Sequence, residues 1–301
     1  MNTLQLTTSI KKEIWEYQKI FLWLPVIIAA FIIMTPLLGH LLTDSLQLLN
    51  LEFLQKIAEM QNSEDLPKIF YGFTTALFMP FIVIASLVQC YYFIACLFDE
   101  RRDLSILFWR SLPVSDAMSV GVKLLVGALI LPGVFLLAAT ITILIFLALA
   151  FVYCTVLSLG FDISLWGFWV NANIISTVLS MWLNLLPYTL WLLPLYAWLM
   201  LVSMFSSKAP FLWAILPVVA LLLVEGFIVH YFHLNSGFIG QFLMDYFSIS
   251  KHTATAYMES NAVVSTVPFT VLSNKISFVG LLIAAGFIYA TYWLRANRSH
   301  S

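Results

Sequence analysis

Charged residues are scarce in this chain. Asp, Glu, Lys and Arg make up 10% of its 301 residues, whereas soluble domains carry roughly 25%. Hydrophobic residues make up 62% and aromatic residues 16%. This composition excludes an ordinary water-soluble globule and predicts a protein of the lipid bilayer. A formal net charge of -1, with 14 cations spread along the chain, also argues against a nucleic-acid-binding surface.

Two common kinds of site motif are missing as well. The three cysteines, Cys90, Cys96 and Cys154, lie inside apolar runs without CxxC spacing, so we expect small buried side chains and neither disulfides nor metal ligands. No GxxxxGK[ST] loop occurs, and the nearest match, "SVGVK" at 119–123, lacks the upstream glycine. Because that loop cradles the phosphates of a nucleotide, any ATP-driven work is expected to come from a partner.

What the chain does have is long apolar runs. A helix needs about 20 mostly apolar residues to cross the hydrocarbon core, and an open sheet there would leave its edge unpaired. The sequence therefore predicts an all-α polytopic membrane protein with one transmembrane domain over residues 1–301. The first run is too long for a cleaved signal and is interpreted as a signal anchor. The predicted spans are 21–42, 70–97, 124–149, 174–202, 211–232 and 278–294.

Lysine and arginine set the predicted orientation. Ten of the 14 cations fall on the side that holds both termini. Short cytoplasmic loops carry the excess of Lys and Arg, so both termini are predicted to be cytoplasmic. The cations on the other side are Lys56, Lys68, Lys251 and Lys275.

The N-terminal segment, residues 1–20, precedes the first span. Its stretch "IKKEIWEYQKI" places Ile10, Ile14 and Tyr17 at helical spacing, with charged residues elsewhere around the helix. This pattern predicts an amphipathic helix lying in the membrane interface.

The last outer loop, 233–277, contains two apolar stretches, "GFIGQFLMDYF" and "AVVSTVPFTVL". Each has about ten residues, too few to span the bilayer. We expect two short half-helices, either re-entrant or interfacial. A small extracellular cap is the alternative.

Charge is concentrated in the loop 98–123 between the second and third spans. Residues 99–103 are five consecutive charges, expected to hold the turn in water. A short amphipathic helix is predicted over 103–111, then Pro113 interrupts it, and Ser115 or Asp116 caps the next helix. An ordinary solvated loop is the alternative. The apolar face of the predicted helix consists of Leu104, Leu107, Phe108 and Leu112.

Few polar residues lie inside the spans. Glu225 sits within an apolar run, so it is expected to line a substrate path or to make a structural hydrogen bond near the membrane surface. Asn184 and Gln89 are weaker candidates for the same path. His230 and His233 are three residues apart, but the HExxH arrangement is absent. Neither a metal site nor a catalytic residue is predicted.

The stretch "ERRDLSILFWRSLPVSDAMSVGVKLL", residues 100–125, resembles the segment that follows the second membrane helix in ABC-2-type ABC transporter permeases. In that family an acidic–arginine pair, an LPVS core and a lysine before the next helix recur. The N-terminal "KKEIWEYQK" and the six-span topology with both ends inside are similar too. The resemblance implies an exporter permease of the bacterial cytoplasmic (inner) membrane, paired with a second permease chain, most simply as a homodimer.

In such a transporter, a separate ATP-binding subunit holds ATP and Mg, and the permease carries no cofactor and no catalytic centre. The resemblance assigns ATPase-coupling roles to Glu100, Arg101, Ser105, Leu107, Leu112, Pro113, Val114 and Ser115. It assigns the interfacial gate helix to Lys11, Lys12, Glu13 and Trp15. The sequence departs from the family at Arg102, Asp103 and Leu104, where relatives often have a turn with glycine.

Two other functions remain open from the residues alone. A stand-alone secondary transporter or channel should show internal repeats and several ionisable groups at mid-membrane, and the sequence shows no convincing repeat. An intramembrane metal-dependent enzyme would have to use His230, His233 and Glu225. The cargo of an exporter is not specified by the sequence, although aromatic, nearly uncharged spans favour an amphipathic or apolar molecule.

Overall fold

The structure is a computed structural model, and it describes residues 3–42, 66–102, 115–160, 174–233, 237–248 and 267–297. Every regular element within these ranges is a helix. Six helical segments are long and apolar enough to cross a membrane. The chain is therefore an all-α, multi-pass membrane protein, as its composition predicts.

The N-terminal segment is α1 (Thr3–Glu16), followed by a π-helical turn, η1 (Lys19–Trp23), and α2 (Leu24–Leu42). α1 is amphipathic as predicted, since Ile10 and Ile14 pack against the core while Trp15 is exposed. One of its charged residues does not face water: Glu13 is 3% exposed. α1 is thus held to the protein by a buried charge as well as by its apolar face.

The second and third spans are longer than predicted. α4 (Leu66–Arg102) continues through the charges that were expected to form a loop. α6 (Asp116–Leu125), η3 (Val126–Ile130) and α7 (Leu131–Gly160) form one continuous helical segment. The helices extend because their terminal charged side chains find partners inside the protein, as described below. Residues 103–114, which include the whole of the short helix predicted over 103–111, lie outside the described residues.

A close approach between α4 and η3 sets the packing of these two spans. A Cβ atom on Gly127 would lie 2.5 Å from Phe93 Cζ and 2.7 Å from Tyr92 Cδ1. Only glycine fits there. The Gln89 side chain, which is fully buried, donates from Nε2 to the Gly127 carbonyl at 2.9 Å, so one acceptor of the π-helical turn is satisfied by a neighbouring span.

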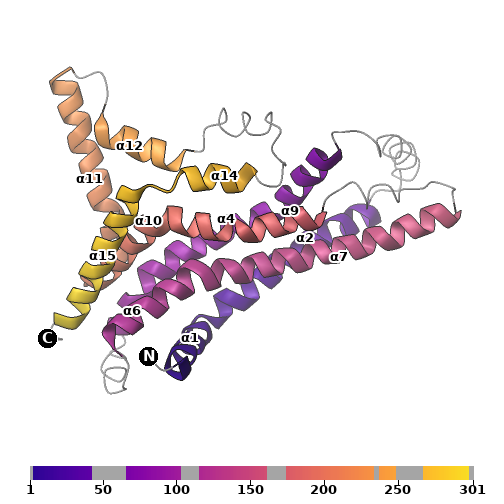
Figure 1. Cartoon of the computed structure of the whole chain (residues 1–301), viewed down its shortest axis with the longest axis horizontal. Coiled ribbons are helices and arrows are strands. Elements are labelled where there is room, and N and C mark those ends of the chain that lie inside the picture. The colour runs from indigo at the N-terminus through magenta and orange to yellow at the C-terminus, as the bar shows by residue number, and fades with distance from the viewer. Residues whose placement is uncertain are drawn as a thin grey trace.

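The fourth predicted span is a pair of helices, α9 (Ile174–Leu183) and α10 (Leu185–Phe205), joined at Asn184. α10 packs against α4 and against α15 (Phe278–Asn297). It is the central helix of the bundle and buries residues along its whole length. By contrast, α11 (Pro210–Tyr231) buries only Ala214, and in Figure 1 it projects away from the bundle of α2, α4, α7 and α10.

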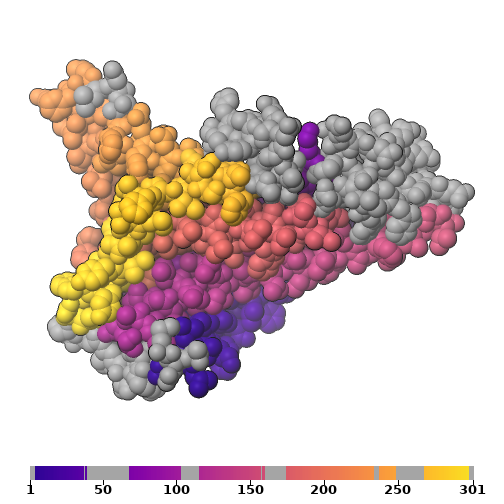
Figure 2. All heavy atoms as spheres, in the orientation of Figure 1, coloured from indigo at the N-terminus to yellow at the C-terminus, as the bar shows by residue number. Residues whose placement is uncertain are grey.

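Two short helices lie where half-helices were expected, α12 (Phe238–Phe247) and α14 (Val267–Asn274). Trp191 Nε1 donates to the Tyr246 carbonyl at 3.2 Å, and the Tyr246 hydroxyl donates to the Trp191 carbonyl, so the end of α12 is fastened to α10. Both short helices lie away from the end of the molecule that holds the two termini (Figure 1). Figure 2 shows α14 lying over α10.

Candidate functional site

Parts of four helices lie at the end of the molecule that holds both termini (Figure 1), and charged side chains from these helices contact one another. They come from α1, the last turn of α4, the first and last turns of α6 and the last turn of α15. We call this group the ion-pair cluster. Its members are Lys12, Glu13, Glu100, Asp116, Lys123 and Arg295.

Glu100 is at the centre of the ion-pair cluster and is 2% exposed. Its Oε1 atom lies 3.1 Å from Lys12 Nζ and 3.2 Å from Lys123 Nζ. Its Oε2 atom accepts a hydrogen bond of 3.0 Å from Arg295 Nη1. One carboxylate near the C-terminus of α4 therefore bonds cations from three other helices.

Lys123 is 1% exposed and bonds Glu13 and Glu100, the two most buried acidic residues of the cluster. Its Nζ atom donates to Glu13 Oε1 at 2.9 Å, in addition to the contact with Glu100. The other oxygen of Glu13 accepts from the Tyr92 hydroxyl at 3.1 Å. A buried carboxylate is stable only when its oxygens are paired in this way.

The fourth helix joins through Arg295, which is 2% exposed. Its Nε atom donates to Asp116 Oδ1 at 3.0 Å, while Nη1 bonds Glu100. Asp116 lies in the first turn of α6 and Arg295 in the last turn of α15. These are the ends at which the helix dipole favours a negative and a positive charge, respectively.

The ion-pair cluster contains three cations and three carboxylates, so its charges balance. Taking one partner out of a buried ion pair leaves an uncompensated charge, at a cost of about 3–5 kcal/mol. Glu16 lies at the rim of the cluster, 3.8 Å from Lys12 Nζ. Burial and the neighbouring Glu13 raise the pKa of its carboxyl above the usual value, despite the nearby lysines.

A second set of bonds joins the ends of α4 and α10. The Arg101 guanidinium donates to the carbonyls of Ser203 and Ser206 in the last turn of α10 and just after it. The Ser203 hydroxyl accepts from the backbone N–H groups of Leu97 and Phe98, at 3.2 and 2.9 Å. Arg101 therefore supplies donors to carbonyls at the end of α10, which would otherwise lack them.

The predicted coupling residues are placed as follows. Ser115 caps α6, accepting from the Met118 N–H at 3.2 Å, which confirms the predicted cap. The expectation that residues 99–103 are held in water is wrong for Glu100, because three cations bond it inside the protein. The remaining predicted residues, Ser105, Leu107, Leu112, Pro113 and Val114, lie outside the described residues.

The predicted gate-helix residues divide into two groups. Lys12 and Glu13 belong to the ion-pair cluster, while Lys11 and Trp15 are exposed. α1 is therefore tied to α4 and α6 by one face and turns the other face outward.

The three predicted path residues do not come together. Glu225 accepts from the backbone N–H groups of Ile239 and Gly240 at the start of α12, the latter at 2.7 Å, which is the structural hydrogen bond that the sequence left open. Gln89 accepts from the hydroxyls of Tyr188 and Tyr196 on α10, each at 3.0 Å. Asn184 lines a cavity that is described below.

His230 lies in the last turn of α11, and His233 follows that helix with a φ of 53°. Among the described residues, no group of three or more His, Cys, Asp or Glu side chains is placed to hold a metal ion.

Sequence reasoning missed Arg295 as a member of the site and treated Lys123 and Asp116 only as a motif residue and a helix cap. A signal was present for Lys123 and Arg295, because each directly flanks a predicted span on the side that holds both termini. Comparison with known proteins gives no match in family models, curated proteins or solved structures. The site is therefore interpreted from its own geometry.

Proposed function

We propose that this chain is the permease subunit of an ATP-driven ABC-2-type exporter of the bacterial inner membrane. It would pair with a second permease chain and with a separate ATP-binding subunit. The observation that carries the proposal is the ion-pair cluster. The predicted coupling loop, 98–123, runs from the end of α4 into α6, and both of these helix ends are bonded within the cluster.

This geometry suits the transmission of a movement. α4 and α6 cannot be displaced at this end without also displacing α1 and α15, because Glu100, Lys123 and Arg295 bond all four helices together. When two ATP-binding subunits close, a coupling segment pushed by one of them would shift these helices as a unit. The change of state would be a rigid-body movement driven by ATP on the partner.

The test is co-purification of the tagged chain with an ATP-binding protein encoded beside it. Arg101 is a poor residue for this test, because its guanidinium supports the end of α10. Leu107→Glu is better, since Leu107 lies on the apolar face of the predicted coupling helix. We expect Leu107→Glu to abolish co-purification of the ATPase and ATP-dependent export, while the membrane domain keeps its thermal stability.

Ile106→Glu is the matched control. It introduces the same charge one residue away, where an α-helix would turn it off the apolar face. Binding of the ATPase should survive in Ile106→Glu. Equal loss in both variants, or full transport by the purified chain without ATP and partner, would contradict the proposal; the second result would favour a stand-alone transporter.

A further inference from the structure

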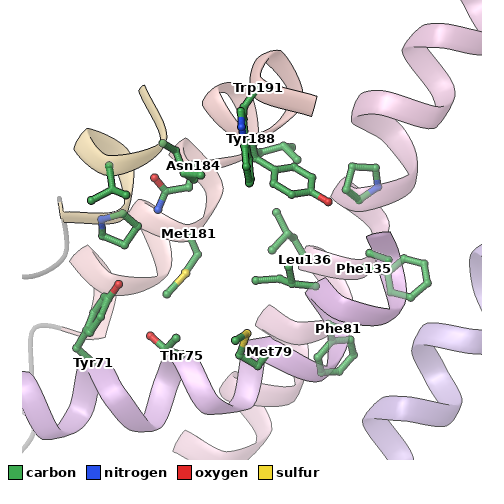
Figure 3. A pocket seen from close by; sticks show the side chains of 17 residues that line it. Tyr71, Thr75, Met79, Phe81, Phe135, Leu136, Met181, Asn184, Tyr188 and Trp191 are labelled. Carbon is green, nitrogen blue, oxygen red and sulfur yellow. The ribbon is translucent and has the colours of Figure 1, made fainter. Parts of the chain in front are cut away.

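A cavity of about 470 Å³ lies between the helices, on the side of α14 and far from the ion-pair cluster. α4, α7, α9, α10 and α14 all contribute to its wall (Figure 3). Ligand-binding pockets typically have volumes of roughly 300–1,000 Å³, so this cavity is large enough for a small molecule. Among the described residues that line it, none is charged.

Most of the lining is hydrocarbon, aromatic ring or thioether. Phe81, Ala85, Phe135 and Leu136 are buried residues of the wall. Figure 3 shows the Asn184 carboxamide near Met181 and opposite Tyr71 and Thr75 on α4, with Phe81 and Phe135 at the other end of the cavity. A wall of this kind excludes ions and favours an apolar occupant with few polar groups.

Two side chains of this wall, Asn184 and Thr75, have polar atoms without a hydrogen-bond partner among the described residues. Asn184 has the larger unpaired group: the residue is 7% exposed, and neither Oδ1 nor Nδ2 is bonded. Its backbone does not need the side chain, because Asn184 N–H bonds the Ser180 carbonyl and Tyr188 N–H bonds the Asn184 carbonyl. A buried carboxamide without a partner is costly, so its presence here indicates a group that a ligand would satisfy.

Two other polar groups of the wall are already paired. The Tyr188 hydroxyl bonds Gln89, and the indole N–H of Trp191 bonds the Tyr246 carbonyl. The Thr75 hydroxyl carries a single donor, whereas the unpaired carboxamide of Asn184 offers two N–H donors and a carbonyl acceptor in a mainly apolar space.

We propose that this cavity binds an uncharged, mainly apolar molecule that carries one amide or hydroxyl group, held by Asn184. The volume is about three times the 150 Å³ of an engineered apolar cavity that holds benzene. A molecule of roughly 18 non-hydrogen atoms is therefore the right size by the same scaling. The short helix α14, through Pro268, Val271 and Leu272, forms one side of the site.

The test uses hexadecanamide with a photoreactive diazirine in its chain, added to the full-length purified protein. Saturable labelling is expected in the peptides around Ala85, Met181 and Trp191. In Asn184→Leu the concentration that half-saturates labelling should rise about tenfold, the effect of one lost hydrogen-bonding group. The hydrocarbon analogue with the same diazirine lacks the amide, so it should label both proteins equally.

Stability provides a second readout. Without ligand, Asn184→Leu should have a Tm equal to or above that of the unchanged protein, because it removes an unpaired polar group. A cavity-filling change, Ala85→Leu, should reduce labelling by both probes. The proposal would be overturned by labelling that is uniform over all membrane helices, or by labelling that is unchanged in Asn184→Leu. A Tm of Asn184→Leu below that of the unchanged protein would also overturn it.

The occupant could come from the bilayer or from the transported molecules, which share this chemistry. Solvent extraction of the purified protein, with measurement of the neutral lipid that it releases, separates the two sources. Release of a neutral lipid in proportion to added hexadecanamide indicates an occupant from the bilayer. Labelling without lipid release indicates a free small molecule. Binding in this cavity needs neither ATP nor a partner. Its failure would leave the coupling proposal standing, and loss of ATPase co-purification would leave the cavity unaffected.

Discussion

At the scale of single residues, Gly127 shows how tightly two spans can approach. An alanine Cβ there would lie 2.5 Å from the Phe93 ring, and the ring cannot retreat freely because it stacks on Tyr196 at a centroid distance of 4.6 Å. We expect Gly127→Ala to destabilise the protein by about 1–3 kcal/mol, the usual cost of overpacking. Thermal unfolding in a fixed detergent measures the change as a lower Tm.

Gly133→Ala is the matched control, because a Cβ at Gly133 meets nothing within 4 Å. In a helix interior, alanine is favoured over glycine by up to about 1 kcal/mol. Gly133→Ala should therefore keep or raise the Tm. Equal effects of the two substitutions would mean that the contact with Phe93 does not limit the approach of α4 and η3.

At the scale of elements, the start of α12 depends on a carboxylate from α11. Both oxygens of Glu225 accept backbone N–H groups, from Ile239 and Gly240, where the helix N-terminus carries unpaired donors and partial positive charge. In Glu225→Leu, hydrogen exchange at these two amides should accelerate about tenfold or more. Mass spectrometry of the peptide that covers α12 reports the change.

In Glu225→Gln, the rate of hydrogen exchange at these amides should lie between that of the unchanged protein and that of Glu225→Leu, because the oxygen of the glutamine side chain still accepts one hydrogen bond. His230→Leu, on the same helix, is the control and should leave exchange in α12 unchanged. If hydrogen exchange in α12 were the same in Glu225→Leu as in His230→Leu, the hydrogen bonds of Glu225 would have no role in ordering α12. That result would favour the alternative that Glu225 lines a substrate path.

At the scale of the whole molecule, the ion-pair cluster joins the first helix of the chain to the last. Glu100→Gln removes one carboxylate from a buried set of three cations and three carboxylates. We expect a loss of about 3–5 kcal/mol and faster hydrogen exchange throughout α1, because Lys12 loses its partner on α4. Tm and the exchange of residues 3–16 are the measurements.

Glu16→Gln makes the same chemical change at the rim. Because burial and Glu13 raise the pKa of Glu16, its charged form is disfavoured in the folded protein, and neutralising it should be harmless or slightly stabilising. Combining Glu100→Gln with Lys12→Gln rebalances the charges, so the double variant should be more stable than the two separate losses predict. Simple additivity would contradict the model of one coupled cluster.

Apolar runs, read one by one, were enough to predict six spans and the amphipathic α1, because crossing hydrocarbon requires length and apolarity that are visible locally. The cap at Ser115 was predictable for the same reason, since a cap involves residues only three apart. The bounds of α4 and α6 were less predictable. Charges in a row resemble a loop unless their partners, which lie far away in sequence, are known.

The sequence by itself therefore determined that this protein belongs in a membrane, its helical class and the six apolar segments that, among the described residues, are long enough to span a bilayer. Only the tertiary structure decided what the polar residues do. Glu100 is 88 positions from Lys12 and 195 from Arg295, and no local pattern encodes such pairings. The same holds for Asn184: only the packing of five separate helices places its carboxamide in the wall of an apolar cavity. Membrane insertion depends on the composition of each segment, whereas the partner of a buried charge depends on how the segments pack.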